Sequence, residues 1–267
     1  MTGACPSRWR PCVWAWVGFE AMLRLEEISK RYIRPDGVRV ALDGVSLELE
    51  RGQIMGIFGP SGSGKTTLLR IAAGLRKPDG GIVTYNGERL DRMTAGERTR
   101  FRRREIACVW ASHPQQERLD VADHVAMPLL VDRCGRRSAE RRVCEALLAC
   151  EAEQCIGMEL RELSAGEHQR VAIARALVTE PRLLLADGPA SNLSIVEQER
   201  IMMLLSELAR KAGVAVLVAD SDAEALLRAD PILYLRDGKL VDSEPMSERG
   251  KVYQFPSTES RRAAADA

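Results

Sequence analysis

Apolar and polar residues alternate most clearly near the start of the chain, over 23–29 and 38–49. This period of two predicts a pair of half-buried strands joined by a turn at 35–37, and thus a small antiparallel β subdomain. Short apolar runs predict fully buried strands at 53–58, 183–186, 214–219 and 232–236. Segments of helical character at 66–74 and 167–177 lie between these runs. Buried strands that alternate with helices predict an α/β fold with a mostly parallel sheet.

The character of the sequence changes between about residues 91 and 162, where charged, helix-favouring residues dominate. We interpret this range as a helical subdomain inserted into the α/β domain, which as a whole spans 22–245. Residues 1–21 stand apart as an extension, either disordered or derived from a misplaced start. Residues 246–267 form a polar tail that is too short for another domain.

The charge balance excludes several function classes. The 267 residues include 39 Lys and Arg against 38 Asp and Glu, so no strong overall field favours nucleic acid or a membrane surface. No apolar run approaches the roughly 20 residues of a spanning helix, so any membrane span must come from another chain. The seven cysteines are scattered and form no CxxC pair, which suits a reducing compartment better than a disulfide framework.

A phosphate-binding loop follows the predicted strand at 53–58. Its backbone N–H groups would surround phosphate oxygens at the start of the next helix, and this strand-loop-helix order predicts a P-loop NTPase core. Lys65 is expected to reach the β- and γ-phosphates, and the Thr66 hydroxyl to bind Mg²⁺. The predicted nucleotide-binding residues of the loop are Gly59, Pro60, Ser61, Gly62, Ser63, Gly64, Lys65, Thr66 and Thr67.

A second motif, LSAGE, opens the helix predicted at 167–177. Its Ser164 and Glu167 have the spacing of a capping box. Together with the phosphate-binding loop and the run LLLAD that ends at Asp187, this motif resembles the ATP-binding cassette (ABC) family over nearly all of 22–241. The residues that resemble the family's signature motif are Leu163, Ser164, Ala165, Gly166 and Glu167.

The resemblance implies cofactors and partners. ATP and Mg²⁺ are the implied cofactors, with Tyr32 placed against adenine and with Thr66 and Asp187 at the metal. Two cassettes would close head to tail, each ATP lying between one phosphate-binding loop and the opposite signature helix. The segment MTAGERTRFRRREI is similar to the subfamily of lipoprotein release, macrolide export and cell division, in which a separate permease crosses the membrane.

That resemblance also implies a location. The chain would lie in the cytoplasm, peripheral on the inner face of the cell membrane and attached only through the permease. The arginine run 98–104 belongs to the same resemblance, so we expect no nucleic-acid partner.

Three positions depart from the family's pattern. Gly188 stands where the family has the glutamate that polarises attacking water, Ala111 where it has glutamine, and Ser221 where it has histidine. The loop 191–194 also ends in serine rather than aspartate. A positioned base alone contributes about 10²–10⁴ in rate, and the rate contributions of groups that act on the same water do not multiply. We therefore predict intact nucleotide binding with weak or absent hydrolysis.

Three hypotheses remain open from the sequence. In the first, the chain is the silent half of a heterodimer whose competent partner uses the intact signature. In the second, it is a homodimeric clamp that ATP closes and slow release resets. In the third hypothesis it is an ordinary ATPase in which Asp220 or Asp222 substitutes for the missing base.

Overall fold

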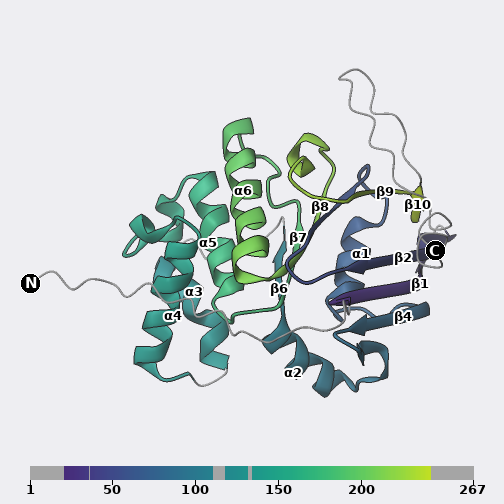
Figure 1. Cartoon of the computed structure of the whole chain (residues 1–267), viewed down its shortest axis with the longest axis horizontal. Coiled ribbons are helices and arrows are strands. Elements are labelled where there is room, and N and C mark those ends of the chain that lie inside the picture. The colour runs from purple at the N-terminus through teal and green to yellow at the C-terminus, as the bar shows by residue number, and fades with distance from the viewer. Residues whose placement is uncertain (1–20, 36, 111–117, 132–133, 242–267) are drawn as a thin grey trace, which may run out of the picture.

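The computed structural model describes residues 21–35, 37–110, 118–131 and 134–241. Within them the chain forms two sheets and six α-helices, with short 3₁₀ turns between them (Figure 1). The predicted α/β architecture, with a P-loop core, an antiparallel β subdomain and a helical subdomain, is confirmed. No helix in the described ranges is long and apolar enough to cross a membrane.

The larger sheet is parallel except at one edge. Its order is β10-β9-β3-β8-β7-β6, and only the pairing of β10 with β9 is antiparallel. The neighbouring strands β7 and β8 are short apolar runs that are buried almost throughout, as expected for strands covered on both faces. The strands of this sheet are β3 (Ile54–Phe58), β6 (Ile106–Trp110), β7 (Leu183–Asp187), β8 (Ala215–Asp220), β9 (Ile232–Arg236) and β10 (Lys239–Val241).

The smaller sheet is antiparallel and has the order β2-β1-β4-β5. Its long hairpin, β1 with β2, contains the alternating segments from which the antiparallel subdomain was predicted. Its strands are β1 (Leu23–Arg34), β2 (Gly37–Leu49), β4 (Gly80–Tyr85) and β5 (Glu88–Arg89).

Two apolar cores lie on opposite faces of the parallel sheet. Alternate side chains of β7 pack into different cores. Leu183 and Leu185 lie in the core shared with α1 and the antiparallel sheet, whereas Leu184 and Ala186 lie in the core under α3–α6. The helices are α1 (Lys65–Ala72), α2 (Ala95–Glu105), α3 (Val121–Val131), α4 (Arg136–Ala149), α5 (Ala165–Leu177) and α6 (Ile195–Ala212). Figure 1 shows α3 and α4 gathered at the end of the molecule away from β1, β2 and β4.

The helical part of the structure is narrower than the predicted range of 91–162. Strand β6, at Ile106–Trp110, falls inside that range and pairs in parallel with β7. Helix α2 packs against β6 rather than joining the group of α3, α4 and α5. Composition alone does not separate a five-residue strand from the charged helix before it.

The core between the sheets gives a test of this packing. Leu185 is fully buried there, so Leu185→Ala should lower the free energy of unfolding by about 2–5 kcal/mol through lost burial and the cavity left behind. Urea denaturation measures this change. Leu148→Ala on α4 is the matched control, since Leu148 is 56% exposed and its truncation should cost less than about 0.5 kcal/mol. Equal effects of the two substitutions would contradict the placement of Leu185.

Candidate functional site

The phosphate-binding loop lies between β3 and α1, at the carboxyl edge of the parallel sheet. Helix α1 begins at Lys65, directly after Gly64. Gly64 has a φ of 115°, and a Cβ atom at this position would lie 2.3 Å from the Ala41 carbonyl oxygen of β2. Only glycine therefore allows the loop to pass so close to the β2 backbone. The predicted strand-loop-helix arrangement is present.

The ammonium group of Lys65 lies inside this loop. Its Nζ donates to the carbonyl oxygens of Gly59 at 2.5 Å and Pro60 at 3.0 Å. A third bond, also 3.0 Å, goes to the hydroxyl oxygen of Ser221. Burial lowers the pKa of Lys65, while the carboxylates of Asp187 and Asp220 act in the opposite direction. A buried cation held by neutral oxygens is well placed to meet an anion that enters the loop.

The two predicted metal-binding residues lie next to each other. The Thr66 hydroxyl on α1 donates to Oδ2 of Asp187, at the end of β7, over 2.6 Å. The contact joins residues 121 positions apart because α1 packs on β7. A hydroxyl and a carboxylate are the hard oxygen donors that Mg²⁺ prefers, together with waters and substrate phosphates. These residues therefore fit a magnesium ion bound beside the loop.

Two of the three departures from the family pattern lie close to this site. Gly188 directly follows Asp187, and its N–H donates to the Ala219 carbonyl oxygen at 2.7 Å. Its φ of 60° is in the left-handed region, and glycine contributes no functional group there. Ser221 follows β8 and contacts Lys65 as described above. Ala111 lies outside the described residues.

The two carboxylates considered as substitute bases both accept hydrogen bonds from nearby groups. Asp220 is 5% exposed; its Oδ1 accepts from the N–H groups of Ser221 at 2.7 Å and Asp222 at 3.0 Å. Its Oδ2 accepts from the Ser191 hydroxyl at 3.4 Å, and burial raises its pKa. Asp222 instead accepts the N–H of Glu224 at 2.9 Å. These bonds hold the loop after β8 in place.

The signature residues open α5 as a capping box. The Ser164 hydroxyl accepts from the Glu167 N–H, and the Glu167 carboxylate accepts from the Ser164 N–H at 2.9 Å. Gly166 is buried against Glu197 of α6, whose carboxylate accepts from Arg170 at 2.9 Å. Helices α5 and α1 lie on opposite faces of the parallel sheet (Figure 1), so one chain does not bring its signature and its phosphate-binding loop into a single site.

Tyr32 lies half-buried on β1, directly opposite Arg39 of β2. The Lys30 Nζ lies 6.0 Å and the Arg76 Cζ 5.5 Å from the centroid of its ring. Sequence reasoning singled out Tyr32 but missed these three cations. For Arg39 the signal was the hairpin register, which sets it across from Tyr32.

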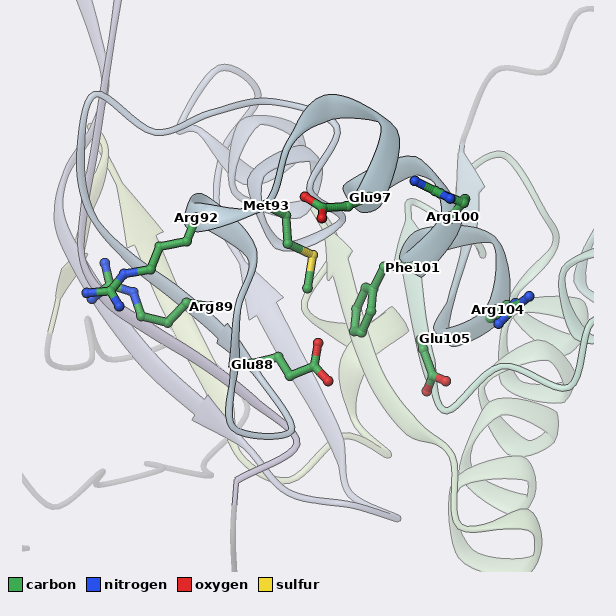
Figure 2. Close-up of a pocket in the computed structure, with 9 residues that line it drawn as sticks. All are labelled: Glu88, Arg89, Arg92, Met93, Glu97, Arg100, Phe101, Arg104 and Glu105. Carbon is green, nitrogen blue, oxygen red and sulfur yellow. The ribbon is translucent and has the colours of Figure 1, made fainter.

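The arginine run of α2 borders a separate cleft of about 710 Å³. In Figure 2 the Met93 and Phe101 side chains lie among those of Glu88, Glu97 and Glu105, with the arginines farther out. The cleft lies at the amino end of β6, whereas the phosphate-binding loop follows the carboxyl end of β3, so the two are at opposite edges of the sheet. Its lining residues are Glu88, Arg89, Arg92, Met93, Glu97, Arg100, Phe101, Arg104 and Glu105.

Sequence comparisons find a matching family and relatives of this chain. A family model described as ABC transporter matches residues 42–191. The lipoprotein-releasing system ATP-binding protein LolD of Hyphomonas neptunium is 36% identical over 84% of this chain and 98% of its own. LolD 1 of Rhodospirillum rubrum is 35% identical over 83% of this chain and 98% of its own.

Solved structures agree with the sequence relatives. The dimeric structure of MJ0796, a bacterial ABC transporter cassette, has a TM-score of 0.75 and 33% identity, covering 82% of this chain and 96% of that one. A dimeric post-hydrolysis state of MJ0796 bound to ADP and Pi has a TM-score of 0.76 and 32% identity, covering 88% of this chain and all of that one.

Proposed function

The chain belongs to the ABC transporter family, and we propose that it is the ATP-binding subunit of a transport complex, which holds Mg-ATP and hydrolyses it weakly or not at all. The observation that carries this proposal is the contrast between two neighbours on β7 and its following loop. Asp187 contacts Thr66 beside the phosphate-binding loop, whereas Gly188 has no side chain to act on water.

Nucleotide binding rests on groups that are in place. The loop 59–64 supplies N–H donors and Lys65 the charge for the phosphates, with Tyr32 available to stack on the base. Thr66 and Asp187 would hold Mg²⁺, which neutralises charge on the phosphate oxygens when bound. The post-hydrolysis structure of MJ0796, which is bound to ADP and Pi, supports nucleotide binding by this fold.

Weak hydrolysis follows from what surrounds the site. In-line phosphoryl transfer depends on groups that orient water and neutralise charge, and loss of a positioned base costs about 10²–10⁴ in rate. Ser221 stands where the family has histidine. Its neighbours Asp220 and Asp222 accept hydrogen bonds from backbone N–H groups of their own loop. This engagement favours a structural role for both over the role of substitute base.

Partners follow from the intact signature. The capping box of Ser164 and Glu167 fixes the start of α5, which a second cassette can contact, and both MJ0796 structures are dimers. We propose a head-to-tail pair in which a competent second cassette supplies the working site. The relatives named as parts of a lipoprotein-releasing system suggest a permease of that kind, through which the chain would be held at the inner face of the membrane.

A homodimeric clamp is the competing arrangement, and subunit composition separates the two. Affinity purification of the native complex, followed by quantitative mass spectrometry, should recover this chain with a different cassette and a permease. A complex with two copies of this chain that turns over ATP would contradict both the heterodimer and the loss of hydrolysis.

The direct test is the identity of the retained nucleotide. After incubation with labelled Mg-ATP and removal of free nucleotide, the purified protein is expected to carry uncleaved ATP, because binding groups are present and the water-activating groups are not. Thin-layer chromatography of the released nucleotide gives the measurement. Steady accumulation of ADP, lost in Lys65→Ala, would show that the chain is an ATPase and that the proposed deficiency is wrong.

A further inference from the structure

Arg39 of β2 lies between the Tyr32 ring and the phosphate-binding loop. It is the direct cross-strand partner of Tyr32, so the two side chains share one face of the hairpin. That face is turned toward the loop, because the Arg39 Nη2 donates to the Gly62 carbonyl oxygen at 3.0 Å. A nucleotide that extends from Tyr32 to Lys65 would therefore pass beside the guanidinium group.

The contact with Gly62 is close on the loop side as well. A Cβ atom at Gly62 would lie 2.8 Å from the Arg39 Nη2, so the guanidinium and the loop backbone are in direct contact. One residue pair further along the hairpin, Arg31 lies opposite Val40, and successive positions of a strand point to opposite faces. The Arg31 side chain therefore projects from the face that turns away from the loop.

Most of the N–H donors of the Arg39 side chain make no hydrogen bond in the part of the chain that the structure describes. A guanidinium group carries five N–H donors, and within the described residues Arg39 makes one hydrogen bond and no ion pair. Its planar fork matches phosphate oxygens, and such charge-assisted bonds are about twice as strong as neutral ones. An exposed, unpaired arginine beside a phosphate-binding loop is thus complementary to a polyanion that occupies the loop.

We propose that Arg39 is a nucleotide-binding residue that contacts the phosphate chain of a nucleoside di- or triphosphate from the β2 side of the loop. This inference rests on the proposed function, since it assigns a further residue to the same site. Lys65 neutralises the phosphates from within the loop, and Arg39 adds a second cation from outside. Two cations favour retention of the nucleotide, which suits a subunit that does not cleave it.

Equilibrium binding of nucleotides to the full chain tests this role. Arg39→Gln is expected to weaken ATP and ADP binding about tenfold and to leave adenosine, measured by competition, unchanged. It should also make ATP binding less sensitive to salt, because one exposed charge contact is lost. Arg39→Lys should keep the charge but not the fork, and so lie between Arg39→Gln and the wild type.

Arg31→Gln is the matched control, since it removes the same group from the adjacent ladder position on the other face. It should leave the affinity for ATP unchanged. An unchanged affinity in Arg39→Gln, an equal loss for adenosine, or an equal loss in Arg31→Gln would overturn the role of Arg39. Failure of the wild-type chain to bind ATP would overturn the proposed function itself, which distinguishes the two.

Discussion

Lys65→Ala is expected to weaken ATP binding by about 2–5 kcal/mol, or roughly 30-fold to several thousand-fold, which is the cost of removing one partner from a buried, hydrogen-bonded charge pair. Lys65 is 8% exposed, and its ammonium group lies within the loop, where it donates to the loop carbonyl oxygens. Its removal also leaves the carbonyl oxygens of Gly59 and Pro60 without their donor and facing the incoming phosphates. Isothermal titration calorimetry with Mg-ATP measures the change.

The control for this variant is another lysine in the same fold. Lys211→Ala removes an exposed ammonium from α6 that pairs with Glu207 over 2.7 Å, far along the chain from the loop. Such surface pairs contribute less than about 1 kcal/mol, so both stability and ATP affinity should stay close to the wild type. If Lys65→Ala bound ATP as tightly as Lys211→Ala, the loop would not be the binding site.

The fold could be predicted where the pattern is local and unbroken. The buried strands β7 and β8 were each predicted from one apolar run, because a strand covered on both faces needs no alternation. Strand β9 was predicted to be fully buried in the same way, but only Leu235 of its five residues is buried. Strand β1 was predicted to end at residue 29 but continues to Arg34. A register irregularity between Ile28 and Lys30, with Glu27 at a φ of 52°, shifts the side-chain alternation, so the pattern breaks while the strand does not.

The site, like the fold, could be predicted where its residues are close together in the sequence. Its contiguous part, the loop and Lys65, follows from the spacing of residues along the chain. The contact between Lys65 and Ser221 joins residues 156 positions apart, and that between Ser191 and Asp220 joins two loops. The first depends on β3 and β8 being neighbours in the sheet order and the second on β7 and β8 being neighbours, which no local pattern contains. The sequence therefore identified Asp220 as a possible base but not the three bonds that hold it.

The strongest test of the proposed deficiency is its repair. Restoring the family's residues in a triple variant, Ala111→Gln, Gly188→Glu and Ser221→His, is expected to raise the rate of ATP cleavage by about 10²–10⁴, the usual contribution of a positioned base. Position 221 already lies against Lys65, so a histidine there starts close to the phosphate site. The single variant Gly188→Glu should gain less, because it leaves positions 111 and 221 without the groups that the triple variant restores. Both variants meet the left-handed backbone at φ 60°, which costs a side-chain-bearing residue about 1–2 kcal/mol.

The matched control replaces Gly188 by glutamine in the same double background. Gln has the size of Glu and meets the same backbone strain, but it cannot accept a proton from water, so only the glutamate variant should form ADP rapidly in a single-turnover assay. The assay is run at high protein concentration, because a head-to-tail pair is needed to place a signature helix over each nucleotide. Equal rates for the two triple variants, or a wild-type rate that matches them, would show that Gly188 is not what limits hydrolysis. A rise confined to the glutamate variant would mean that the rest of the site, including Lys65, Thr66 and Asp187, is still arranged for phosphoryl transfer and lacks only the groups that act on water.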